Sequence, residues 1–350
     1  MACFNRVRAL RRSVVLAVAL AACSESPPEA LPAPDATEVG DVAPGEPWRE
    51  IVGPGPGKRW GHVAVLDGKR ARMIVWGGTD DGGKKNDAWA LSLDDETWQA
   101  LPAPGGPTAR YTAGAVIDAA RDRMIVLGGD DGAARGDVWA LDLAAGTWTE
   151  LPAGPSARFD VAAATDGGTA WFFAGFAQGF VALGDLWALD LGTTTWRELP
   201  TADPRPSPRT NGGFGVHSGS LWVVGGHDAA ALTPDVWRYD LAGERWKPVT
   251  PPGGLDGWAH FAYAVDGACG VLWLVGADNN DTVDLPLVAG LVLGGAPRFV
   301  SPTFAATFPA RRHAVVALDS GKRRLIVMGG AARDDTVYGD TWLSPTLTCP

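Results

Sequence analysis

RMIVWGGTDDG spans residues 72–82, and RMIVLGGDDGA spans residues 123–133. Each segment joins a short apolar run to a Gly-Gly pair and an acidic turn. The glycine pair returns at 225–226 and 329–330, and altered versions, Ala-Gly and Gly-Ala, stand at 174–175 and 276–277. Successive steps between these six copies are 51, 46, 51, 51 and 53 residues. A period of about 50 residues is typical of propellers and related arrays, so the chain is organised as six repeats.

Each repeat is predicted to contain four short β-strands. Runs such as MIVW and LIVM are apolar and β-branched, and glycine ends them, as expected for a buried strand. Runs such as WALDL alternate apolar and polar residues, as a half-buried strand does. Four-stranded units repeated around an axis form a β-propeller, so we predict an all-β, six-bladed propeller. Two sets of aromatic residues mark the third and fourth strands, namely Trp89, Trp139, Trp187, Trp237 and Trp342, and Trp98, Trp148, Trp196, Trp246 and Phe299.

The two ends of the repeat region complement each other. The sixth repeat lacks a second tryptophan, and Trp48 stands before the first repeat with no unit of its own. Trp48 precedes Trp98 by 50 residues, in register with the series. An open ring would expose two unpaired sheet edges, which favour aggregation. We therefore predict that residues 47–52 supply the last strand of the final blade and close the ring.

Residues 47–345 resemble the kelch-repeat family, whose propeller galactose oxidase shares. The resemblance rests on the Gly-Gly pair, the acidic turn after it and the two spaced aromatic residues. It implies that the glycines permit a tight turn and that the tryptophans fill the space between blades. The copper site of galactose oxidase is not expected, because the chain has only four tyrosines and Cys269 should lie on the wrong face.

Residues 1–22 are typical of a secretory signal peptide. Four arginines precede the apolar run VVLAVALAA, which is too short to span a membrane permanently. The run ends in LAAC at residues 20–23, which resembles a bacterial lipobox and implies lipidation of Cys23. Cleavage near Ala22 without lipidation is the alternative. Residues 23–46 are rich in proline and acidic residues and predict an extended tether. Ser24 is compatible with export of the lipoprotein to the outer membrane of a bacterial cell envelope.

Charge and cysteine content set further limits. The net charge is −10, or −14 without the four arginines of residues 1–22, and the repeats contain no basic stripe. Nucleic-acid binding requires clustered Lys and Arg, so the sequence argues against it. Cys269 lies in a predicted turn, and Cys349 lies in the C-terminal tail, residues 346–350, predicted to end on the same face. We expect a disulfide between them in an oxidising compartment, with two free thiols as the alternative.

A column of arginines opens the first strand of the repeats. Arg59, Arg110, Arg158, Arg209 and Arg311 form it, with Gly257 in the fifth repeat. One rim of the propeller should gather these residues, and loops on a rigid scaffold commonly carry function. In one interpretation they bind a sugar or a carboxylate, and in the other they pair with acidic loops and carbonyl groups. The candidate ligand-binding residues are Arg59, Trp60, Arg110, Tyr111, Arg158, Phe159, Arg209, Trp258 and Arg312.

Acidic loops lie on the same predicted rim. Carboxylates and carbonyl oxygens are the ligands that Ca²⁺ prefers, but Asp and Asn also favour turns. No EF-hand, HExxH or CxxC spacing occurs, so we predict neither a metal site nor a cofactor. The loops are Asp80–Asp81, Asp130–Asp131, His227–Asp228, Asp278–Asp281 and Asp334–Asp335.

These observations favour a membrane-anchored, monomeric scaffold that binds a protein or a glycan at the propeller rim. The alternative is a sugar-active enzyme similar to the exported sialic-acid mutarotases, with arginines lining the channel mouth. Arginines open to the channel would favour the enzyme, and arginines paired with aspartates would favour the scaffold.

Overall fold

The computed structural model describes residues 46–228, 230–251, 257–278 and 284–350. The predicted signal peptide, Cys23 and the tether up to residue 45 lie outside these residues, as do Asn279, Asn280 and Asp281. Among the residues that are described, no helix is long and apolar enough to cross a membrane.

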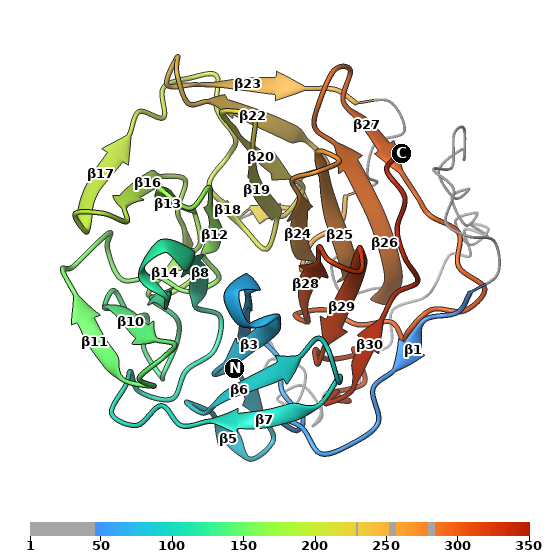
Figure 1. Ribbon diagram of the computed structural model, residues 1–350. Helices are drawn as coiled ribbons and strands as arrows, with labels where there is room; N and C mark the ends of the chain where they lie inside the picture. Colours follow the sequence, from blue (N-terminus) through green and yellow to red (C-terminus); the bar gives the residue numbers. More distant parts are fainter. Residues whose placement is uncertain (1–45, 229, 252–256, 279–283) are drawn as a thin grey trace, which may run out of the picture. The chain divides into compact units, whose positions relative to one another are not determined.

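Six four-stranded antiparallel sheets make up the fold, which confirms the predicted six-bladed propeller (Figure 1). The inner strands contact one another in a closed cycle of β2, β8, β12, β19, β24 and β28. Blades one to three contain β2 (Val63–Asp67), β3 (Arg72–Trp76), β6 (Ala88–Ser92) and β7 (Trp98–Leu101); β8 (Gly114–Asp118), β9 (Arg123–Leu127), β10 (Val138–Asp142) and β11 (Trp148–Leu151); and β12 (Ala162–Thr165), β13 (Thr169–Phe173), β16 (Leu186–Asp190) and β17 (Thr195–Leu199).

Blades four to six repeat this arrangement. They contain β19 (Gly213–His217), β20 (Ser220–Val224), β22 (Val236–Asp240) and β23 (Arg245–Val249); β24 (Ala262–Asp266), β25 (Val271–Asp278), β26 (Asp284–Val292) and β27 (Arg298–Val300); and β28 (Val315–Asp319), β29 (Arg324–Met328), β30 (Thr341–Leu343) and β1 (Arg49–Glu50). Three short pairings lie in the rim loops, β4 (Thr79–Asp80) with β5 (Gly83–Lys84), β14 (Phe176–Ala177) with β15 (Val181–Ala182), and β18 (Arg209–Thr210) with β21 (His227–Asp228). Two 3₁₀ turns cover Gly68–Arg70 and Ala119–Arg121.

The hydrophobic core consists of clusters between neighbouring blades. Successive residues of a strand face opposite sides of the sheet. Met73 and Val75 therefore pack toward blade six, while Ile74 and Trp76 pack toward blade two. Each blade is buried on both faces, which explains why the runs before the glycine pair are continuously apolar.

The glycine pair makes this close packing possible. Gly78 has a φ of 92°, and a Cβ atom there would lie 2.8 Å from the Cβ atom of His62. Side chains avoid both this backbone region and such a distance, so glycine is required. The pair ends the second strand and turns the chain onto the rim.

The N-terminal strand closes the ring, as predicted. Strand β1 pairs with β30, and Arg49 lies opposite Leu343. Trp48 is 4% exposed and makes edge contacts with Phe304 and Phe308, at ring-centroid distances of 5.5 and 4.8 Å. The last blade is therefore built from both ends of the repeat region (Figure 1).

The C-terminal tail is held at the same place. Cys269 and Cys349 form a disulfide, with their Cα atoms 5.3 Å apart across 80 residues of sequence. Leu347 is buried in the cluster that contains Trp48. Ring closure thus uses a strand pairing and aromatic contacts, and the disulfide ties the tail that follows β30 to blade five.

We expect Trp48→Ala to lower the free energy of unfolding by about 3–5 kcal/mol, because it removes a buried indole. Urea denaturation followed by circular dichroism measures this change. Val52→Ala is the matched control, since Val52 follows the same strand and is 90% exposed. Equal stability of the two variants would contradict ring closure by this segment.

Candidate functional site

The five column arginines are buried in ion pairs within their blades. Arg158 donates from both terminal nitrogens to Asp185, over 2.7 and 2.8 Å, and to the carbonyl oxygen of Ala174 over 3.2 Å. Asp185 also accepts a 2.7 Å hydrogen bond from the indole of Trp187. The other pairs have the same design, and all five arginine side chains are at most 2% exposed: Arg59–Asp87, Arg110–Asp137, Arg209–Asp235 and Arg311–Asp340.

The aspartate in each pair is the residue that begins the D-x-W segment of the third strand. Its carboxylate is bound by arginine on one side and by indole on the other, and hydrogen bonding to it holds its pKa below its usual value against the effect of burial. The partners are therefore not the acidic residues that follow the glycine pair. The paired arrangement is the one that the sequence analysis associated with a scaffold.

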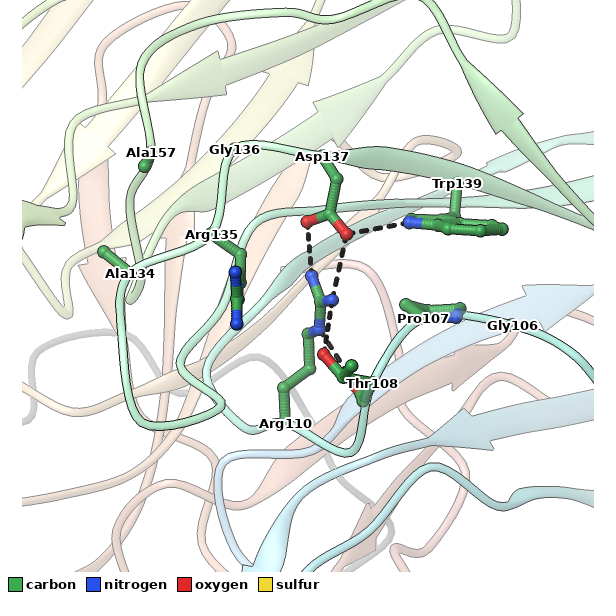
Figure 2. A pocket seen from close by; sticks show the side chains of 10 residues that line it. All are labelled: Gly106, Pro107, Thr108, Arg110, Ala134, Arg135, Gly136, Asp137, Trp139 and Ala157. Atoms are coloured by element: carbon green, nitrogen blue, oxygen red, sulfur yellow. Dashed lines mark hydrogen bonds and ion pairs between the residues drawn. The ribbon is translucent and has the colours of Figure 1, made fainter.

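Figure 2 shows one of these pairs beside a surface groove of about 470 Å³. Asp137 lies between Arg110 and Trp139 and binds both. Arg135, also in the groove, pairs with Asp131 over 2.7 Å. The arginines of this groove are thus engaged by carboxylates of the same blade.

The structure corrects the alignment of blade five by one residue. Ala259 bridges to Asp278 as Trp60 bridges to Thr79 in blade one. Trp258 therefore occupies the arginine position, and Gly257 precedes it. Arg312 follows the column arginine Arg311 and pairs with the fully buried Asp278 over 2.8 Å.

One residue from each blade forms a ring around the axis, which the sequence analysis did not foresee. All six have a left-handed backbone, with φ between 52° and 61°. Backbone hydrogen bonds link five of the six neighbouring pairs, and the hydroxyl of Thr210 bonds to the carbonyl oxygen of Asp160 at the sixth step. The ring residues are Gly61, Thr112, Asp160, Asn211, His260 and His313.

Aromatic side chains continue along one side of this axial ring. Tyr111 meets Trp60 edge to face at 5.0 Å between ring centroids, Trp60 lies 5.4 Å from His313, and His313 lies 4.5 Å from His260. His260 is hydrogen bonded to Asp278 at 2.8 Å. The predicted residues Trp60 and Tyr111 are partly exposed there and belong to one cluster.

Asp160 is the second carboxylate at the axis, and its pKa is shifted in the opposite direction from that of Asp278. Burial would raise the pKa of Asp278, but bonds to His260 and Arg312 hold it below its usual value. Burial and the negative charge of Asp130 raise the pKa of Asp160 to about 7, against the opposing effects of His260 and Asn211. Among the described residues, Asp160 has no ion-pair partner.

Phe159 belongs to a separate cluster at the rim of blade three. Its ring lies 5.6 Å from Phe176 and 5.5 Å from Phe180, both in the β14–β15 hairpin. Phe159 is 6% exposed, whereas Phe180 and its neighbour Val181 are 50% and 60% exposed. Phe159 therefore supports a hairpin whose tip presents apolar side chains to solvent.

The acidic loops contain aspartates in ion pairs. Asp80 pairs with Lys85 over 2.7 Å, and Asp130 with Lys84 over 3.3 Å. Within the described ranges, no three His, Cys, Asp or Glu side chains are grouped so as to hold a metal ion.

Comparison with protein families gives one match. The model for the KLHDC2/KLHL20/DRC7 Kelch-repeats domain matches residues 61–276, which is more than half of the chain. A search of curated proteins finds no match.

We expect Arg158→Met to lower the free energy of unfolding by about 2–3 kcal/mol, because it leaves the partly buried Asp185, whose side chain is 24% exposed, without its cation. Arg197→Met is the matched control, since Arg197 is 59% exposed and pairs with Glu244 at the surface. That change should cost at most about 1 kcal/mol. Urea unfolding of both variants measures the difference, and similar losses would argue against a structural role of the arginine column.

The raised pKa of Asp160 predicts a pH-dependent stability. The folded state holds the proton of Asp160 more tightly than the unfolded chain, so the penalty appears as pH rises from about 4 to about 7. Asp160→Asn should therefore be more stable than the wild type at pH 8, by on the order of 1 kcal/mol or more, and nearly equal to it at pH 4. Thermal or urea unfolding across this range checks the trend. A difference that does not change with pH would contradict it.

Proposed function

The chain belongs to the kelch-repeat family, and we propose that it is a non-catalytic scaffold whose rim docks a partner protein. Kelch propellers commonly mediate protein interactions, and this coarse function follows from the family.

The β14–β15 hairpin is the observation that carries the proposal. Only three large hydrophobic side chains of the described residues are strongly exposed, Val52, Phe180 and Val181, and two of these are adjacent at the hairpin tip. Exposed apolar groups that stand together often mark interaction sites, and aromatic anchors contribute strongly to protein interfaces. The rings of Phe159 and Phe176 pack against each other and against the ring of Phe180, and they support it from below.

The same geometry argues for a protein in preference to a sugar substrate. The guanidinium groups of Arg59, Arg110, Arg158 and Arg209, which a mutarotase-like reaction would need, are each bound to a carboxylate inside their blade. These groups are therefore already engaged within the chain. An apolar hairpin tip suits a protein surface better than a polar glycan.

The proposed address is the cell envelope of a bacterium, reached through a lipid on Cys23. The sequence of residues 1–23 supports this, with its basic start, its short apolar run and the LAAC ending. Acyl chains would hold the protein on the membrane, and residues 24–46 would let the propeller reach a partner. Radiolabelled fatty acid should be incorporated into the wild type and not into Cys23→Ser.

Phe180→Ser combined with Val181→Ser should abolish partner capture without lowering the unfolding temperature. Full-length tagged protein is expressed in its own host, cross-linked and purified, and co-purifying proteins are compared with those of the wild type. Val52→Ser is the matched control, because it removes an exposed valine, 90% accessible, away from the hairpin. A partner retained equally by all three proteins would contradict docking at the hairpin.

A further inference from the structure

The axial side chains form a corner that suits a cation. The rings of Trp60 and Tyr111 meet at 73°, with their centroids 5.0 Å apart. Both rings are partly exposed, as is Asp160 of blade three, whose backbone amide donates to the carbonyl oxygen of Thr112, the residue after Tyr111, over 2.7 Å. The π-faces of tryptophan and tyrosine attract ammonium groups, and a nearby carboxylate strengthens this attraction.

The charges of this corner are unbalanced. Asp278 forms an ion pair with Arg312 over 2.8 Å and is hydrogen bonded to His260 over 2.8 Å. Asp160 lacks such a partner in the described part of the chain, and its carboxyl is sufficiently desolvated to raise its pKa to about 7. Asp130 and Asp160 together raise the pKa of Tyr111, after the larger effect of burial, so the phenol lies near both carboxylates. A cation placed here would remove an electrostatic penalty.

The ammonium group of Lys84 already binds to one aromatic ring and one carboxylate of this region. Its ammonium nitrogen lies 5.6 Å from the centroid of the Tyr111 ring and 3.3 Å from Asp130. The ring and the carboxylate therefore bind an ammonium group within the chain itself. Lys84 pairs with Asp130 and not with Asp160, so the carboxylate of Asp160 is left for a second cation.

We infer that Trp60, Tyr111 and Asp160 form a recognition site for a lysine-type ammonium side chain of the docked partner. The inference rests on the proposed function, because the hairpin would position the partner and the axial corner would select a basic residue in it. The acidic mature chain, with its net charge of −14 once residues 1–22 are removed, favours the approach of a basic partner.

The probe is Nα-acetyl-lysine methylamide, and the neutral analogue is Nα-acetyl-norleucine methylamide. Titration of the full chain, followed by saturation-transfer NMR, should give a dissociation constant of about 1 mM for the lysine compound. The norleucine compound should bind at least about tenfold more weakly, because it keeps the alkyl chain and loses the charge.

Three variants and one control locate the binding. Asp160→Asn and Trp60→Leu should each weaken lysine binding by about fivefold or more, while both remain folded by circular dichroism. Lys84→Met should strengthen it by about twofold, because it removes a competing cation from the corner. Val52→Ser should leave it unchanged, since Val52 lies in the segment after β1.

Equal binding of both compounds, or lysine binding that survives in Asp160→Asn and Trp60→Leu, would overturn the inference. Its failure is distinguishable from failure of the docking proposal. If partner capture requires the hairpin while the lysine compound binds no better than the norleucine compound, the docking proposal is supported and the cation site is contradicted. If the lysine compound binds as predicted and no partner depends on the hairpin, the cation site is supported and the docking surface is contradicted.

Discussion

The buried arginine–aspartate pair is the interaction on which the five regular blades depend. Its guanidinium comes from the segment before the inner strand, its carboxylate from the start of the third strand, and a third contact is the carbonyl oxygen at the first position of the glycine pair. One side chain thus fixes three segments at the same rim. Burying a guanidinium is costly unless its donors are hydrogen bonded, and the two-pronged geometry binds both terminal nitrogens. In Arg59 the Nε donor has no hydrogen-bond partner among the described residues. Blade five lacks the pair, and there the second and third strands are longer, with 8 and 9 residues, so that Ala277 and Asp278 continue the strand pairing.

Residues that recur in every regular blade and residues that differ between blades therefore have different roles. The glycines, arginines, D-x-W segments and second tryptophans recur because every blade must pack against two neighbours. The axial ring repeats a backbone conformation while its side chains differ, from Gly61 to Asp160 to His313. Blade one also has a short rim hairpin, β4–β5, but among the described residues only the β14–β15 hairpin carries exposed large apolar side chains, Phe180 and Val181. Both proposals rest on positions that differ between blades.

Most of the fold could be predicted from the sequence, and only part of the candidate site. Glycine spacing and the unmatched Trp48 were enough for the blade number and the ring closure, because packing between blades imposes them locally. The partners of the arginines were less accessible, since the aspartate before each tryptophan looks like an ordinary strand residue. In blade five, Gly257 and Trp258 imitate the arginine–aromatic order, and only the bridge between Ala259 and Asp278 reveals the shift. Five of the six axial-ring residues are Gly, Asp, Asn or His, which adopt the left-handed backbone more readily than most residues, and Thr112 is the exception. That column of residue types was visible, but their meeting at the axis depends on the closed ring.

A double-mutant cycle on Arg158 and Asp185 tests most directly whether the arginine column holds the propeller together. Arg158→Met, Asp185→Leu and the double variant are unfolded in urea, and the coupling free energy is taken from the four proteins. A structural pair should give a coupling of about 2–3 kcal/mol, at the upper end of what neighbouring residues show. A coupling near zero would contradict a structural role of the arginine column and would leave these arginines as candidate ligand-binding residues.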